Sequence, residues 1–230
     1  MRPLWLLDTI GSRLIQEEQE ELADVLSTSI GKGFLQIGIW GHNKTFTKHL
    51  LADEFFLVEQ TVIEGVDLVA KFDRLPIQDQ MIDVVFLPHT LEQFKVNKLI
   101  LSSTTELLKD GGKLIAIGFN PLSLWGLRHY LSGQRFLFGI NQLISVKRYS
   151  TWLTDLGFGI EKIHYFHALL PVVKRYDLPL KIHIFNPFLC ACYMIIANKE
   201  HIPMTLEKQF KRNSYKQSGS LADSMSRVIE

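Results

Sequence analysis

The sequence has few cysteines, no strong excess of charge of either sign and no long apolar run. Cys190 and Cys192 are its only cysteines among 230 residues, and two cysteines one residue apart on a strand are poorly placed for a disulfide. We expect both to be reduced core residues, with a chemical role for the pair as the lesser alternative, and this usage fits a cytoplasmic protein. The formal net charge is +1, which argues against nucleic acid as a partner bound by bulk electrostatics.

The apolar runs are also short. The longest extend over about ten residues, which is too few to cross a membrane as a helix. The start of the chain lacks the basic and apolar pattern of a signal peptide. His164 and His167 lie three residues apart in or after an expected strand, and the other histidines show no ligand spacing, so we expect no metal site.

The chain is organised around residues 67–119. Three apolar runs, at residues 67–70, 81–88 and 113–119, are expected to be strands, and residues 91–108 are expected to form a helix that Gly111 and Gly112 end. Strands that are apolar on both faces belong in a parallel sheet with helices on both sides. Ligands bind such sheets beyond the carboxyl ends of the strands.

The remaining pattern predicts one α/β domain, residues 1–200, followed by a mobile basic tail, residues 201–230. An amphipathic helix is expected at residues 12–28, with Glu17, Glu18, Glu20 and Glu21 facing solvent. Further strands are expected at residues 34–38, 55–58, 159–166 and 188–197. Further helices are expected at residues 44–52 and 146–158 and after the turn at residues 120–123.

The first expected strand leads into a loop that contains Gly38 and Gly41. A strand, a glycine loop and the start of a helix make an anion-binding corner, because glycine allows close backbone approach to a ligand. Glu59 follows the second strand about twenty residues after Gly38. A glutamate at that spacing can accept hydrogen bonds from both hydroxyls of a ribose, although an acid after a strand is as often a surface residue.

Four segments in order resemble the motif series of class I S-adenosylmethionine-dependent methyltransferases. They are residues 75–77, 83–85, 89–92 and 108–114. Residues 119–128 are similar to a bacterial group of methyltransferase-like proteins, the YafS-like group. The resemblance covers about residues 1–198. It implies a doubly wound, mostly parallel seven-stranded sheet with an antiparallel last strand, S-adenosylmethionine as cofactor, and the helix at residues 12–28 as a lid.

The resemblance also implies a set of cofactor-binding residues. They are Gln36, Gly38, Trp40, Gly41, Glu59, Phe72, Asp73, Leu75, Pro88, His89 and Thr90. Three positions depart from the family pattern. Gln36 replaces an acid, Trp40 replaces the second glycine of the loop, and Lys71 replaces the acid that receives the adenine amino group. The loop is therefore either a modified cofactor loop or a structural turn.

His89 is the candidate catalytic residue, because an imidazole titrates near neutral pH and can act as a general base. Its alternatives are lining the pocket without proton transfer, or packing at the strand end. Asn120, Trp125 and Arg128 follow the fifth expected strand and are candidates for binding the acceptor. The aromatic and aliphatic residues around them favour a small or lipophilic acceptor.

The sequence therefore predicts a cytoplasmic methyltransferase that transfers a methyl group from S-adenosylmethionine to a small or lipophilic molecule. Gln36, Trp40 and Lys71 support a different hypothesis, a degenerate methyltransferase fold that serves as a binding or scaffold module. The basic residues after position 200 would support an RNA methyltransferase as a third possibility.

Overall fold

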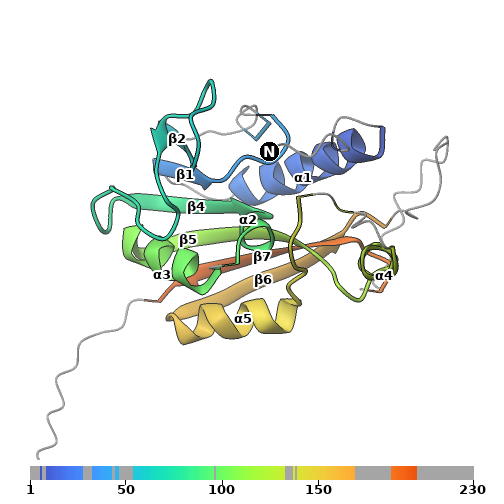
Figure 1. The fold of residues 1–230 in the computed structure, drawn as a ribbon. Helices are drawn as coiled ribbons and strands as arrows, with labels where there is room; N and C mark the ends of the chain where they lie inside the picture. Colours follow the sequence, from blue (N-terminus) through green and yellow to red (C-terminus); the bar gives the residue numbers. More distant parts are fainter. Residues whose placement is uncertain are drawn as a thin grey trace, which may run out of the picture.

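The computed structural model describes residues 6, 9–27, 33–42, 45–46, 54–95, 97–132, 137, 139–168 and 188–200 (Figure 1). The tail, residues 201–230, lies outside these residues, as do most of the helix expected at residues 44–52 and most of the loop before the last strand. The division into a domain and a tail therefore stays a prediction. Within the described residues, no helix is long and apolar enough to cross a membrane.

A seven-stranded sheet forms the centre of the molecule, in the order β3-β2-β1-β4-β5-β7-β6. The strands are β1 (Gly33–Ile37), β2 (Glu54–Glu59), β3 (Leu68–Val69), β4 (Ile82–Pro88), β5 (Leu108–Phe119), β6 (Phe158–Phe166) and β7 (Cys192–Lys199). The first five pair in parallel, and β7 pairs antiparallel with both β5 and β6. The predicted mostly parallel sheet with an antiparallel last strand is confirmed.

Helices cover both faces of this sheet (Figure 1). They are α1 (Thr9–Ser27), α2 (Thr90–Gln93), α3 (Asn97–Leu107), α4 (Leu124–Leu131) and α5 (Val146–Asp155). The apolar residues of α3 and α5 pack into one core layer, and those of α1 pack into the layer on the opposite face. The helix predicted at residues 12–28 is thus confirmed as α1.

Side chains alternate between these two layers along each central strand. In β5, Leu114 and Ala116 belong to the layer under α3 and α5, whereas Ile115 and Ile117 belong to the layer under α1. β1, β4 and β7 divide their residues in the same way. Because both faces are buried, these strands read as continuous apolar runs in the sequence.

The segment before β5 differs from the sequence-based expectation. The helix expected at residues 91–108 is divided, because Phe94 has an extended backbone between α2 and α3. β5 begins at Leu108, which pairs with Ile82, and the pairing resumes between Lys113 and Val84. The residues between Leu108 and Lys113 therefore form a bulge, where Gly111 adopts a φ of +74°. The two glycines serve this bulge within a strand and do not end a helix.

Candidate functional site

The order of the strands reverses at the pair formed by β1 and β4. In an open parallel sheet, this reversal leaves a crevice outside the carboxyl ends of the two strands. Gly38 follows the last residue of β1, and His89 follows the last residue of β4. Residues at these two strand ends are therefore the first candidates for a functional site.

Gly38 sits in a backbone conformation that only glycine adopts readily. Its φ is +86°, and a Cβ atom there would lie 3.2 Å from Oγ1 of Thr90. The Thr90 hydroxyl donates a hydrogen bond to the carbonyl of Ile37, which ties the end of β1 to the start of α2. Gly41 also has a positive φ, +74°, and a Cβ there would meet Thr45 and Ile15 at 2.9 Å. The predicted glycine loop is thus a tight corner.

Glu59 lies beside this corner. It is the last residue of β2, and its carboxylate accepts hydrogen bonds from the backbone N–H groups of Ile39 at 3.0 Å and Gln60 at 2.8 Å. The side chain is only partly buried. The structure therefore brings the predicted glutamate to the predicted glycine loop, with a carboxylate that can accept further hydrogen bonds.

Gln36 stands at the position where the family has an acid. Its side-chain amide is buried, and Nε2 donates to the carbonyl of Gly38 at 2.9 Å. The other amide atom, Oε1, has no hydrogen-bond partner in the described part of the chain. A buried acceptor without a donor is costly, so this oxygen marks a place where a ligand donor would be stabilised.

The predicted adenine-side residues lie around the ends of β2 and β3. Phe72 is fully buried and packs edge-on against Phe94, with ring centroids 5.0 Å apart. Leu75 is partly buried against the same core. Asp73 and Lys71 are exposed. Apolar packing is therefore available on this side, while neither charged residue is held in a buried position.

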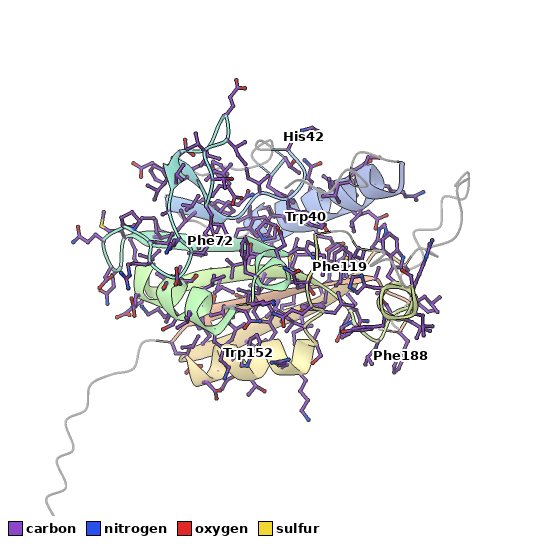
Figure 2. All side chains as sticks on the ribbon, viewed as in Figure 1. Trp40, His42, Phe72, Phe119, Trp152 and Phe188 are labelled. Atoms are coloured by element: carbon purple, nitrogen blue, oxygen red, sulfur yellow. The ribbon has the colours of Figure 1, made fainter. Side chains whose placement is uncertain are left out.

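Trp40 occupies the interior above the end of the sheet. Its ring is fully buried, and Nε1 donates to Oε2 of Glu18 in α1 at 2.9 Å. The ring centroid lies 4.3 Å from that of His89 and 6.0 Å from that of Phe119. Figure 2 shows Trp40 and Phe119 inside the molecule, between α1 and the sheet. The side chain that replaces the second loop glycine thus fills space beside the glycine corner.

His89 is buried between two carboxylates. Nε2 lies 2.9 Å from Oε1 of Glu18, and Nδ1 lies 2.9 Å from Oε2 of Glu92. Glu92 in turn accepts a hydrogen bond from the backbone N–H of Phe119 at 3.0 Å. His89 has a φ of +53°, which is unusual for a residue with a side chain and is held here by the surrounding contacts. The predicted flanking residues, Pro88 and Thr90, are also buried.

The charges of this cluster favour a protonated imidazole. Burial lowers the pKa of His89, but the two facing carboxylates outweigh burial and raise this pKa from 6.5 to about 9. Burial likewise raises the pKa of Glu92, against the opposing effect of His89. At neutral pH both ring nitrogens are bound to carboxylates. In this arrangement neither nitrogen presents a free lone pair to a substrate, and the role of His89 as a general base stays a prediction.

The expectation that Glu18 faces solvent is wrong. Its side chain is fully buried and bonds to Trp40 and His89. The sequence carried a signal for this, because Leu14, Glu18 and Leu22 are four residues apart and share one stripe of α1. Glu17, by contrast, is partly exposed and contacts Nδ1 of His167 at 3.0 Å.

The candidates for acceptor binding are separated by burial. Trp125 is fully buried and packs against Phe119 and His167. Asn120 is buried, and its amide donates to the carbonyl of Cys190 at 3.2 Å. Arg128 is exposed on α4. The structure thus places two of the three in the core, beside the buried cluster, and one at the surface.

Both cysteines are buried and free of a disulfide. This confirms the expectation that they are reduced core residues. Cys192 opens β7 and lies in the core layer under α1. Its pKa is raised well above its usual value, because burial disfavours the thiolate and the nearby carboxylates add to that effect.

A family model described as a methyltransferase domain matches residues 43–116. The uncharacterized protein YafS of Escherichia coli (strain K12) is 34% identical over 134 residues. This match covers 58% of the present chain and 55% of YafS, so it spans about half of the relative's length.

Two solved structures with a similar fold are described as S-adenosylmethionine-dependent methyltransferases. One, from Thermotoga maritima, has a TM-score of 0.62 and 18% identity, covering 85% of this chain and 93% of its own. Another, from Archaeoglobus fulgidus, has a TM-score of 0.59 and 17% identity, covering 81% and 94%. Residues 43–116 thus match a methyltransferase domain model, the described chain has the fold of these solved methyltransferases, and part of its sequence is similar to YafS.

Proposed function

We propose that this protein binds S-adenosylmethionine and transfers its methyl group to a small or lipophilic acceptor. The observation that carries the proposal is the Glu59 carboxylate, which lies at the glycine corner where the strand order reverses. The match to a methyltransferase domain supports S-adenosylmethionine as the cofactor.

The residues of the corner fit such a cofactor on its ribose side. Glu59 is an acceptor-only group at the end of β2, as two ribose hydroxyls require. Glycine at position 38 places no side chain at this corner, and Oε1 of Gln36, which has no partner within the described residues, would receive a donor from the methionine part. The buried ring of Phe72 and the partly buried Leu75 supply apolar packing for the adenine.

Methyl transfer requires little of the protein beyond placing the acceptor and the cofactor relative to each other. S-adenosylmethionine supplies a methyl group on a positively charged sulfur, which makes that carbon reactive toward an electron pair of the acceptor. The protein must align the acceptor with this carbon and exclude water from the site. Glu18 holds α1 over the end of the sheet through Trp40 and His89, and α1 would serve as the cover that excludes water.

An exposed apolar surface on α4 supports a lipophilic acceptor. α4 and the turn before it expose five large apolar or aromatic side chains, Leu122, Leu124, Leu127, Tyr130 and Leu131. Phe188, which is also exposed, lies at the same end of the molecule (Figure 2). Exposed apolar residues that gather in this way mark a binding surface more often than isolated ones do.

Calorimetric titration with S-adenosylmethionine and S-adenosylhomocysteine tests the proposal. We expect micromolar binding by the natural protein and at least a tenfold loss in Glu59→Ala, because the ribose hydroxyls lose their acceptor. Glu54→Ala is the matched control, since Glu54 is an exposed glutamate at the opposite end of the same strand. Equal affinity in Glu59→Ala and the natural protein would contradict the proposed site.

One observation favours a second function. Trp40 fills space beside the corner and is held there by Glu18, which suits a methyltransferase fold that has become a binding module without catalysis. This alternative predicts that the folded protein binds neither S-adenosylmethionine nor S-adenosylhomocysteine in the same titration. Binding of either compound would remove its support.

A further inference from the structure

Three different ligand-type side chains meet in the core beneath α1. Glu18 comes from α1, His89 follows β4, and Cys192 opens β7. One carboxylate oxygen, one ring nitrogen and the sulfur lie within 4.8 Å of one another, and all three residues are buried. Two of these atoms, Oε1 of Glu18 and Nε2 of His89, are 2.9 Å apart.

The outer contacts hold these atoms in place. His89 uses its other nitrogen, Nδ1, to contact Glu92, which is itself fixed by the backbone N–H of Phe119. Glu18 uses its other oxygen, Oε2, to accept a hydrogen bond from Trp40. A carboxylate behind a histidine is the usual outer support of a metal-bound imidazole, because it orients the ring and increases the basicity of the ligating nitrogen. The arrangement thus has both an inner set of donors and an outer set of supports.

We propose that Oε1 of Glu18, Nε2 of His89 and Sγ of Cys192 bind one zinc ion. A mixed set of oxygen, nitrogen and thiolate donors suits zinc, which accepts all three. Tetrahedral zinc with ordinary bond lengths places its ligand atoms about 3.3–3.5 Å apart. Oε1 of Glu18 and Nε2 of His89, 2.9 Å apart, would part by a few tenths of an ångström, and the sulfur, which lies within 4.8 Å of both atoms, would take up the same spacing.

The two positive charges of the zinc ion are offset by the loss of two protons from its ligands. Zinc would replace the proton of the Cys192 thiol and one proton of the His89 ring, and both protons would leave to solvent. The three-residue set therefore keeps the same total charge with and without the ion. Three protein ligands leave a fourth tetrahedral position for water or another small ligand.

Sequence spacing gave no indication of this site. The ligands are dispersed over three elements, and only the packing of α1 on the sheet brings Glu18 to His89. The proposal therefore revises the expectation of no metal site, which rested on histidine spacing alone. Its three ligand atoms differ from the groups at the Glu59 and Gly38 corner, so metal binding can be measured separately from binding of S-adenosylmethionine.

Metal content and cobalt spectroscopy test the proposal on the full-length protein. The protein is stripped with a chelator, reconstituted with zinc chloride or cobalt chloride in a non-thiol reductant, and freed of excess metal. We expect one zinc per chain, and a thiolate-to-cobalt charge-transfer band when cobalt replaces zinc. Cys192→Ser should lose this band and bind zinc at least tenfold more weakly. The matched control, Cys190→Ser, should keep both, because Cys190 is also a buried cysteine outside a disulfide but is not one of the three proposed ligands.

Two results would overturn the proposal. The first is wild-type protein that retains no zinc or cobalt after reconstitution, which would leave the cluster as a buried ion pair that anchors α1. The second is a charge-transfer band of equal strength in Cys192→Ser. The wild-type measurement decides the question even if Cys192→Ser does not fold, which far-ultraviolet circular dichroism would reveal.

Discussion

The carboxyl edge of the sheet has two halves that differ in burial and in how they are held. At the end of β2, Glu59 is partly exposed and is held by backbone N–H groups of its own neighbourhood. At the end of β4, His89 is fully buried and is held by side chains from α1 and α2. The first half keeps the open carboxylate of a ligand site, while the second is a closed cluster that joins separate elements.

This difference in burial predicts which half tolerates substitution without loss of the fold. Removing one member of a buried, paired set of charges leaves the others unpaired, and this is strongly destabilising. Glu18, Glu92 and His89 are such a set, so they serve stability as well as any ligand. Removing the Glu59 carboxylate should destabilise the fold much less, because solvent reaches it.

The largest expected change in stability comes from a substitution in the buried cluster at the end of β4. Trp40→Gly restores the glycine that the family has in this loop, and it removes a fully buried ring that bonds to Glu18. We expect the free energy of unfolding to fall by about 4 kcal/mol. We also expect the affinity for S-adenosylmethionine to rise, because the space beside Gly38 is opened. Denaturant unfolding and calorimetric titration measure the two effects.

Trp152→Gly is the control for this change. Trp152 is also buried, but it belongs to α5 and packs in the core layer on the opposite face of the sheet. It should destabilise the protein without raising cofactor affinity. A loss of affinity in Trp40→Gly larger than in the control would show that Trp40 helps to bind the cofactor instead of filling its place.

The partly exposed half, with Glu59 and Gly38, could be predicted from the sequence because its pattern depends on residues close together in the chain. An acid after the second strand and glycines after the first are recognisable by spacing, and the strands themselves are apolar runs of the right length. The mostly parallel seven-stranded sheet and its antiparallel last strand followed from the family resemblance and are confirmed, whereas the order of the strands was read from the structure.

The closed half could not be predicted in the same way, because its contacts join residues far apart in the chain. Only the packing of α1 on the sheet reveals that Glu18 bonds to His89. The same limit explains the bulge before β5, where pairing of Leu108 with Ile82 overrides the tendency of the glycines to end a helix. Long-range pairing decides both features.

A smaller effect is expected from pH in the metal-free protein. The pKa of His89 is raised to about 9 by Glu18 and Glu92 against the effect of burial, whereas an unfolded histidine titrates near 6.5. The folded state then binds more protons than the unfolded state between these values, so stability is full below pH 6.5 and falls as pH rises toward 9. We expect a loss of about 3 kcal/mol at most.

Urea unfolding in the presence of a chelator, at pH 6.5, 7.5 and 9, measures this loss. His89→Asn is the comparison, because asparagine tolerates a positive φ and does not titrate. Its stability should vary less over the same interval. If the natural protein is as stable at pH 9 as at pH 6.5, the imidazole is not held protonated between the two carboxylates.

The smallest effect concerns the glycine corner that borders both halves. Gly38→Ala places a methyl group 3.2 Å from Oγ1 of Thr90 at a φ of +86°, and we expect a loss of stability of about 1–2 kcal/mol. Gly111→Ala is the matched control, because Gly111 has a φ of +74° with no atom within 4 Å of the added methyl group. Both variants place alanine at a positive φ, so the difference between them reports mainly the contact with Thr90. Only Gly38→Ala should also weaken binding of S-adenosylmethionine in the calorimeter, and equal binding by the two variants would mean that the corner does not approach the cofactor.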